Sequence, residues 1–361
     1  MNQNTKKRNN KKKKRIGLKI LLAVLIIIVA LAGFFVYKTN QNGGGMQGMI
    51  ATIVGHNPEK LKDLDPLYFV VLGESVAGDS RLTDTIIVCK YDPKTQQAAM
   101  MSVPRDTYTG TGGAANATAY YKINNAYNAG KNPENTVKIL NRLTGLDIKY
   151  YVWVNTNVLK ELVDEIGGVY FYVPKDMHYI DVTQNLYIDL KEGYQKLDGD
   201  HAEQVVRYRH DNSTRSNYGP SYSSEYGVED YGRMRTQREF IKATIEQTLK
   251  PENILKVGTF LDIAYRNIKT NMPIDVIKDY LPYAVNFSTD NLKMGLLPGA
   301  DTNQTYDSSW VYFVDSKKTK LLVDQLFLHP EDYDEDGNKI EKDNTVSNTT
   351  TKNATTNNTT N

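Results

Sequence analysis

Arginine and aspartate residues gather in four short segments of this 361-residue chain, each at the end of an expected strand or helix. These segments are residues 78–85, 102–106, 206–211 and 232–238. Guanidinium groups stay charged and can hold phosphate oxygens through two parallel hydrogen bonds. Asp79 and Asp84 in the first segment carry hard oxygen ligands that suit a Mg²⁺ ion bridging phosphates. Together the four segments predict a binding site for an anion, most simply a phosphate.

A set of surface ion pairs is the alternative explanation, because every arginine in these segments has an acidic residue close to it in the sequence. Arg233 and Gln237 would share one face of a helix, whereas Arg207 and Arg209 would share a face only in an extended segment. Two long polar stretches, 107–120 and 212–227, flank the charged segments, and such stretches are typical of lids, binding loops or disorder. The position of the charges beside these loops favours the anion site.

Several other classes of site are excluded by what the sequence lacks. It has no Gly-rich Walker loop, no Cys/His metal spacing and no nucleophile elbow. Its single cysteine, Cys89, lies in an apolar run and is expected in the core. Eight of the 44 Lys and Arg residues lie in the first fifteen positions, so the rest of the chain has 36 against 42 Asp and Glu. A mildly acidic domain argues against nucleic-acid binding.

The N-terminus has the pattern of a membrane anchor. A basic tail (1–15) is followed by an apolar run from Ile20 to Val36, which as a helix would cover about 26 Å of a bilayer core of roughly 30 Å. We predict a transmembrane helix over residues 16–38, with the basic tail cytoplasmic and the rest of the chain extracellular. A cleaved signal peptide is the alternative, but its cleavage triplet would have to be Ala30-Leu31-Ala32, inside the apolar run.

The elements that must position the charged segments alternate between strands and helices after a linker (39–66). Apolar runs predict strands at 68–72, 85–91, 97–103, 150–154, 169–173 and 292–296. Helical spacing predicts helices at 156–166, 199–209, 232–250, 251–265, 274–285 and 311–326. Over residues 67–329 this alternation predicts one α/β domain with a sheet covered on both faces, followed by a disordered tail (330–361) that is acidic and then Thr/Asn-rich.

The charged segments also carry a specific resemblance. The chain resembles the LytR-CpsA-Psr family of cell-wall glycopolymer ligases over roughly residues 67–250. The matching motifs are Asp84-Thr85, Ser102-Val103-Pro104-Arg105-Asp106, Lys122-Ile123-Asn124-Asn125-Ala126-Tyr127, Gly167-Gly168-Val169, Leu197-Asp198-Gly199, Val206 to Asp211, and Gly232-Arg233 with Gln237. Ser75 stands where the family usually has an aspartate, and Leu82 where it usually has an arginine. We therefore assign those two roles to Asp79 and Arg81.

The resemblance implies an α-β-α sandwich with a mixed central sheet that binds a polyprenyl pyrophosphate. It implies a phosphotransferase that moves a teichoic acid, a capsular polysaccharide or a related polymer from this lipid to peptidoglycan. The pyrophosphate would be bound by Arg81, Arg105, Lys122, Arg207, Arg209, Arg233 and Gln237. Asp84 and Asp79 would hold Mg²⁺, and the catalytic residues would be Arg105 with Asp106 or Asp79 as the base. The sequence leaves open a non-catalytic, membrane-anchored binder or regulator, and a phosphatase acting on the same lipid.

Overall fold

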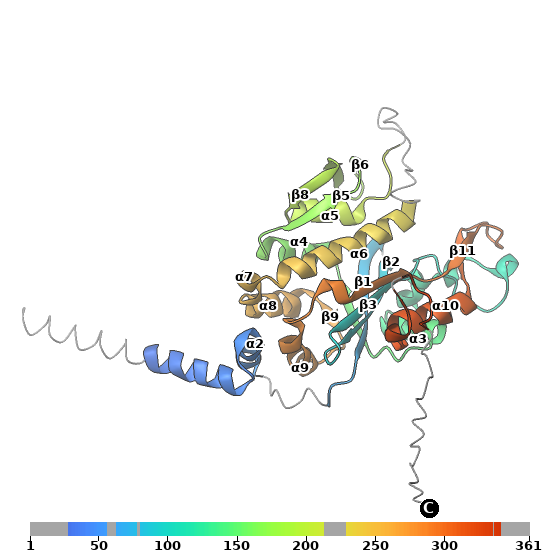
Figure 1. Ribbon diagram of the computed structural model, residues 1–361. Coiled ribbons are helices and arrows are strands. Elements are labelled where there is room, and N and C mark those ends of the chain that lie inside the picture. The colour runs from blue at the N-terminus through green and yellow to red at the C-terminus, as the bar shows by residue number, and fades with distance from the viewer. Residues whose placement is uncertain (1–27, 56–62, 78–79, 213–228, 335, 341–361) are drawn as a thin grey trace, which may run out of the picture.

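A six-stranded mixed sheet forms the centre of the protein (Figure 1). The computed structural model describes residues 28–55, 63–77, 80–212, 229–334 and 336–340. The sheet order is β10 (Leu292–Leu296), β3 (Gln97–Ser102), β2 (Ser80–Asp92), β1 (Leu67–Ala77), β4 (Tyr150–Val154) and β9 (Lys269–Thr270). The β10–β3 and β1–β4 pairs are parallel, and the other three pairs are antiparallel. A mixed central sheet in an α/β fold was predicted, and the structure confirms it.

Successive side chains on each strand point to opposite faces of the sheet. Apolar residues occupy both sets of positions, so both faces are apolar. One face carries Val70, Leu72 and Val88 and packs against α3 (Glu134–Thr144), α10 (Ser316–Val323) and the π-helix η7 (Asp324–Leu328). The other face carries Phe69, Val71, Ile87, Cys89, Met100 and Met294 and is met by Ile241 of α6 (Glu229–Thr248). Cys89 is a buried core residue, as predicted.

Beyond α6 lies a second apolar cluster built from two two-stranded antiparallel ribbons and two helices (Figure 1). The ribbons pair β5 (Val169–Val173) with β8 (Gly193–Leu197), and β6 (Met177–Asp181) with β7 (Leu186–Leu190). The helices are α4 (Thr156–Glu165) and α5 (Gly199–Arg207). α4 and α5 approach so closely that a Cβ on Gly199 would lie 2.6 Å from the Lys160 carbonyl oxygen. Only glycine fits at this position.

A third apolar cluster attaches the N-terminal part of the described chain. Residues 28–41 are helical, and a turn at Gly43 and Gly44, both with positive φ, leads into α2 (Gly45–Val54). α2 buries Ile50 and Val54 against α7 (Pro251–Ile254), α8 (Val257–Asn267) and α9 (Ile274–Ala284). No helix among the described residues is long and apolar enough to span a bilayer. Residues 1–27, which hold much of the predicted span 16–38, lie outside those residues.

Most predicted elements are found within a few residues of their expected bounds, but two helix predictions were wrong in detail. Residues 311–314 form β12 (Val311–Val314), which pairs with β11 (Gly299–Thr302), so the predicted helix 311–326 does not begin there. Asp315 ends the strand and caps α10 by accepting hydrogen bonds from the next turn. The predicted helix 251–265 is divided into α7 and α8. Helix α3 and the strands β6 to β8 were not predicted.

Of the two long polar stretches, only the first can be described. Residues 107–120 pack against the β11–β12 hairpin, with Tyr108 and Ala117 buried beside Val311. The backbone N–H of Tyr108 donates to the Tyr312 carbonyl oxygen at 2.8 Å. This segment is therefore anchored to the hairpin by a few buried residues, while most of it lies at the surface. Residues 213–228, which include nearly all of the second stretch, lie outside the described residues, as does most of the tail 330–361.

Candidate anion-binding site

Three segments that are distant in sequence place charged side chains together at one end of the central sheet. They are the middle of β2 with Asp84, the loop after β3 with Arg105 and Asp106, and the first turn of α6 with Asp230 and Arg233. The register of the β1–β2 pair shifts here, because Gly73 pairs with Thr85 and Glu74 with Thr83, which leaves Asp84 as the extra residue of a β-bulge in β2. A Cβ on Gly73 would be 2.8 Å from the Thr85 Cβ, so the bulge depends on glycine.

Arg105 is the centre of the first half of the cluster. Its Nη1 lies 3.1 Å from the Asp84 Oδ2. Its Nε lies 3.5 Å from the Asp230 Oδ2 and 3.8 Å from the Asp106 Oδ2. Lys122 Nζ then holds the other oxygen of Asp106 at 2.8 Å. The predicted residues Asp84, Arg105, Asp106 and Lys122 thus form one continuous chain of opposite charges.

Asp230 joins this chain to two further arginines. Its Oδ1 lies 2.6 Å from Arg233 Nη2 and 3.4 Å from Arg209 Nε. Arg233 Nη2 also donates to the Asp84 backbone carbonyl oxygen at 3.2 Å. Asp230 was not predicted as a site residue, although its position three residues before Arg233 at a helix start was a usable signal. One carboxylate therefore sits among the guanidinium groups of Arg105, Arg209 and Arg233.

Burial strengthens the electrostatic coupling in this cluster, which we call the arginine cluster (Asp84, Arg105, Asp106, Lys122, Arg209, Asp230 and Arg233). The Arg233 side chain is only 8% exposed. Burial by itself would raise the pKa of the Asp84 carboxyl group, but the charges of Arg105 and Arg233 and hydrogen bonds from Arg105 and Ser75 outweigh it and lower the pKa. Asp84 is therefore ionised at neutral pH. Ser75, at the position where the family usually has an aspartate, contributes to this site.

Four predicted site residues do not join the cluster by contacts in the structure. Arg207 is the last residue of α5. Its guanidinium group donates hydrogen bonds to Glu203 of the same helix at 3.0 Å and to Gln184 of the β6–β7 turn at 2.7 Å. The Gln237 amide donates to the Val206 carbonyl oxygen at 2.9 Å and connects α6 to α5. Arg81 pairs with Glu74 at 2.6 Å and is about half exposed. Asp79 lies outside the described residues. Their roles in binding or catalysis remain predictions.

The charge balance of the arginine cluster limits what it can bind. Its four cationic side chains face three carboxylates, so the described cluster carries a net charge of about +1. A diphosphate brings more negative charge than this excess can neutralise. An incoming diphosphate must therefore displace a carboxylate from the arginines, bring a cation with it, or do both.

The donor set fits a magnesium ion only in part. Among the described residues there is no group of three His, Cys, Asp or Glu side chains that could hold a metal. Asp84 Oδ1, however, is buried and accepts no hydrogen bond from any residue that the structure describes. Mg²⁺ in proteins commonly takes one or two carboxylates together with substrate phosphates and water. Asp84 can supply one such oxygen.

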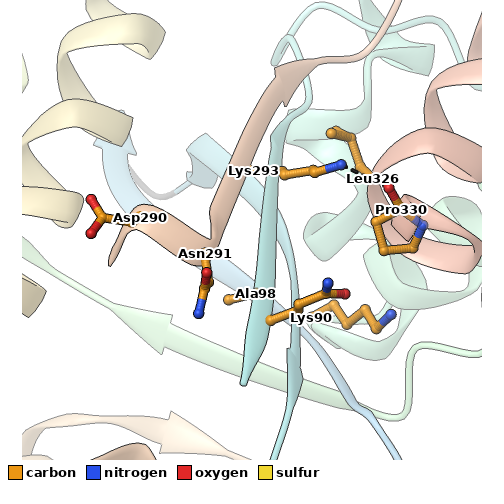
Figure 2. A pocket seen from close by; sticks show the side chains of 8 residues that line it. Lys90, Ala98, Asp290, Asn291, Lys293, Leu326 and Pro330 are labelled. Carbon is orange, nitrogen blue, oxygen red and sulfur yellow. Dashed lines mark hydrogen bonds between the residues drawn. The ribbon is translucent and has the colours of Figure 1, made fainter. Parts of the chain in front are cut away.

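A small cavity lies elsewhere. It has a volume of about 120 Å³ and is lined by Lys90, Ala98, Lys293, Leu326 and Pro330, among others (Figure 2). Ala98 is near the start of β3, whereas Arg105 follows the end of that strand. Lys293 donates to the Pro330 carbonyl oxygen at 2.9 Å, and Lys90 to the Phe327 carbonyl oxygen at 2.7 Å. These lysines fix the C-terminal helical turns to the sheet and do not form part of the arginine cluster.

Comparison with known proteins decides the family. The family model described as LytR_cpsA_psr matches residues 34–327, which is most of the chain. The protein belongs to the LytR_cpsA_psr family. A teichoic acid transferase from Bacillus cereus, named polyisoprenyl-teichoic acid--peptidoglycan teichoic acid transferase TagU, is 27% identical over 278 residues. That alignment covers 77% of this chain and 83% of the relative. The TagU of Bacillus mycoides has the same identity and coverage.

Solved structures show the same fold. The crystal structure of Bacillus subtilis TagV has a TM-score of 0.57 at 22% identity and covers 72% of this chain and 96% of its own. The structure of TagT bound to LI-WTA has a TM-score of 0.55 at 20% identity and covers 73% of this chain and 89% of its own. The fold inferred from the family resemblance is therefore confirmed independently of the charged segments.

The LytR_cpsA_psr motifs of this chain separate into two groups in space. One group contributes Asp84, Arg105, Lys122 and Arg233 to the arginine cluster. The other group is structural, since Val169 of the Gly-Gly-Val motif pairs directly with Leu197 of the Leu-Asp-Gly motif. Asp198 in the latter motif caps α5. Family motifs therefore specify both the site and the packing of the second cluster.

Proposed function

We propose that this LytR_cpsA_psr protein is a phosphotransferase that moves a glycopolymer from a polyprenyl-pyrophosphate carrier to peptidoglycan. The observation that carries the proposal is the convergence of Arg105, Arg209 and Arg233 on one carboxylate at the end of the sheet. Such a convergence is the arrangement needed to bind a diphosphate. The relatives named as teichoic acid transferases support the transferase class and the two kinds of partner.

The pyrophosphate of the carrier would replace Asp230 among the three arginines. Its lipid would follow the apolar face of the sheet that is covered by α6. Phe69, Val71 and Met294 on that face are only partly buried, so they offer apolar surface on the same sheet. Contacts to the polymer beyond the diphosphate would determine which donor the protein accepts: teichoic acid, capsular polysaccharide or another polymer.

The reaction follows from this placement. The acceptor hydroxyl oxygen attacks the sugar-linked phosphorus, and the bond from that phosphorus to the bridging oxygen breaks. Polyprenyl phosphate leaves with the electron pair, while the guanidinium groups stabilise its growing charge. Asp106, held by Lys122 at 2.8 Å, is the described carboxylate that can take the hydroxyl proton. Asp79 remains the second candidate base.

We include a Mg²⁺ ion in the proposal. Asp84 would hold it through the buried Oδ1, together with phosphate oxygens of the substrate. When bound, the ion would supply positive charge that the nearly balanced arginine cluster lacks. Removal of divalent cations by a chelator should therefore weaken binding of inorganic pyrophosphate to the wild type, and should have a smaller effect on an Asp84→Asn variant.

A membrane location completes the proposal. The helical residues 28–37 expose Ile28, Val29, Leu31, Phe34 and Phe35, which is unusual for a helix surrounded by water. Together with the apolar sequence that precedes them, these residues support an anchor with a cytoplasmic N-terminus and an extracellular domain. The anchor would bring the arginine cluster to the lipid carrier.

The test compares arginines inside and outside the cluster. We expect Arg105→Ala and Arg209→Ala to lower transfer by about 10²- to 10³-fold, because each removes charge stabilisation at the leaving group. Arg207→Ala should lose less than Arg209→Ala, since the Arg207 side chain is bound to Glu203 and Gln184. Arg266→Ala, on the surface of α8, is the matched control and should be unchanged.

Transfer is measured as labelled polymer moved from the lipid to isolated peptidoglycan, with polyprenyl phosphate and free phosphate quantified in parallel. Polymer release without attachment would identify a lipid pyrophosphatase. Binding of the lipid without either product would identify a non-catalytic binder. Full transfer by both Arg105→Ala and Arg209→Ala would refute the proposed function.

A further inference from the structure

The ribbon formed by β5 and β8 has one buried face and one exposed face. Val169, Phe171 and Val173 point into the second apolar cluster. The alternate residues Tyr170 and Tyr172 point outward, and Tyr194 and Lys196 of β8 also lie on the exposed side. Cross-strand pairing places Tyr172 opposite Tyr194 and Tyr170 opposite Lys196. The exposed face of this ribbon therefore carries three tyrosines side by side.

These tyrosines are unusually open to solvent. The exposed fractions are 47% for Tyr170, 55% for Tyr172 and 72% for Tyr194. The rings of Tyr170 and Tyr194 are nearly parallel, with an interplanar angle of 16° and centroids 6.0 Å apart. Exposed aromatic side chains that cluster are a mark of a binding surface, whereas single ones are common on any protein. Rigid tyrosines also lose little conformational entropy when a partner binds.

Two lysines lie at the edge of this aromatic surface. Lys196 Nζ is 5.8 Å and Lys250 Nζ is 5.9 Å from the centroid of the Tyr170 ring. Neither ammonium group has a carboxylate within ion-pair distance among the residues that the structure describes. Their charge is therefore available to an anionic partner. We call Tyr170, Tyr172, Tyr194, Lys196 and Lys250 the tyrosine platform.

We propose that the tyrosine platform binds the glycan strand of the peptidoglycan acceptor. The apolar C–H face of a pyranose ring packs against the electron-rich face of an aromatic ring, and phenol hydroxyls can bond sugar hydroxyls. The lysines match the carboxylates that peptidoglycan carries. Peptidoglycan combines a chain of sugar rings with carboxylates, and the tyrosines and lysines of the platform match both, so the occupant is the acceptor.

The position of the platform suits a long acceptor. Arg233 is near the start of α6, while Tyr170 lies by Lys250, just beyond its end at Thr248. At a rise of 1.5 Å per residue, the helix separates the two places by about 22 Å. A strand bound at the platform is thus held near the arginine cluster without occupying it. The choice of peptidoglycan as the occupant rests on the proposed function. The description of the tyrosine platform as a binding surface does not depend on that function.

The experiment measures binding of the full chain, in detergent micelles, to peptidoglycan sacculi stripped of attached polymers. We expect the Tyr170→Ala/Tyr194→Ala double variant to bind the sacculi about tenfold more weakly, from the loss of two aromatic contacts. Lys250→Glu should weaken binding several-fold, and Tyr194→Phe should retain most of it. Tyr265→Ala is the matched control, because Tyr265 is 84% exposed and lies on α8 and not on the β5–β8 ribbon.

Binding of inorganic pyrophosphate to each variant is measured in parallel and should be unchanged, which separates this proposal from the proposed function. Equal binding of sacculi by the wild type, the double variant and Lys250→Glu would overturn the platform. So would wild-type binding only to sacculi that still carry their polymer. If the double variant unfolds, Lys250→Glu decides the question, since it replaces an exposed side chain.

Discussion

Asp84 is a carboxylate whose ionisation is tied to two arginines. Protonation would leave Arg105 and the buried Arg233 without part of their compensating charge, and a buried charge that loses its partner is costly. The pKa of the carboxyl group is therefore lower in the folded chain than in the unfolded chain. The unfolded chain takes up the proton first as the pH falls, so acid weakens the folded state through this residue.

We expect this contribution to be complete above the ordinary pKa of 3.8 and to disappear as the pH falls through the lower, folded pKa. Urea unfolding of the wild type and of Asp84→Asn at pH 7 and at pH 3 measures it. The free-energy difference between the two proteins should shrink at the lower pH. Asp262→Asn, which changes an exposed ion pair on α8, is the control. A difference that stays constant with pH would show that Asp84 does not titrate as described.

Helices α4 and α5 are an element pair whose spacing depends on one residue. Gly199 begins α5, and a methyl group there would meet the Lys160 carbonyl oxygen and the Asp164 carboxylate. The same carboxylate accepts a hydrogen bond from the Gly199 N–H at 2.8 Å. Since α5 leads directly into Arg209, the contact between the two helices also fixes the approach of that arginine to Asp230.

We expect Gly199→Ala to lower the free energy of unfolding by about 1–3 kcal/mol, because the helices must move apart. Gly258→Ala is a matched control in α8, where nothing lies within 4 Å of the added methyl group. It should be neutral or stabilising by about 0.4–1 kcal/mol. Thermal unfolding followed by circular dichroism compares the two variants. Equal effects would show that the close approach of α4 and α5 is not rigid.

At the scale of the molecule, α2 connects the N-terminal helix to the globular part of the protein. Its residues Ile50 and Val54 are buried against α7, α8 and α9. Asn286 also donates to the Gln47 side chain at 2.9 Å. The segment 39–66 was predicted to be a linker, but its residues 45–54 form a helix that packs on the domain. The N-terminal helix is therefore joined to the domain by a docked helix and a short glycine turn.

Two truncated chains test this connection. A chain that begins at Gly45 should keep the stability of the domain, whereas one that begins after residue 55 should lose about 3 kcal/mol or more, from exposure of Ile50 and Val54 and of their partners. Chemical unfolding of both chains is the measurement. Ile50→Ala in the full chain should reproduce most of the loss, about 2–5 kcal/mol. Equal stability of the two truncated chains would mean that α2 is not part of the folded domain.

The sequence was most informative where a single rule controlled the local structure. Apolar runs predicted β4, β5 and β10 with their observed bounds. Strands β6 to β8 escaped because each carries charged or polar side chains within its five residues, such as Asp181, Asp189 and Lys196, whereas β5 is Val-Tyr-Phe-Tyr-Val. The apolar residues 311–314 are compatible with a helix or a strand, and their pairing with β11 makes them a strand. These failures all concern pairing, which is a property of the tertiary structure.

For the site, too, the sequence predicted some features and not others. Motif order was sufficient to select Asp84, Arg105, Asp106, Lys122, Arg209 and Arg233, which the structure brings into one cluster. The orientation of side chains could not be read in this way. Arg207 and Arg209 are two residues apart, yet the first binds Glu203 and the second faces Asp230. Asp230 belongs to no matched motif, and its distances to three arginines show that it joins the cluster.

The carboxylate of Asp230 has a consequence for selectivity. Its negative charge already lies beside the guanidinium groups that a ligand would need, so the described cluster is not an open cationic surface. Chloride or a carboxylic acid offers no more charge than Asp230 does, and it lacks the advantage of being tethered. Only a ligand of higher charge density gains by taking that place. Asp230 thus sets a minimum charge density for a ligand, and abundant small anions fall below it.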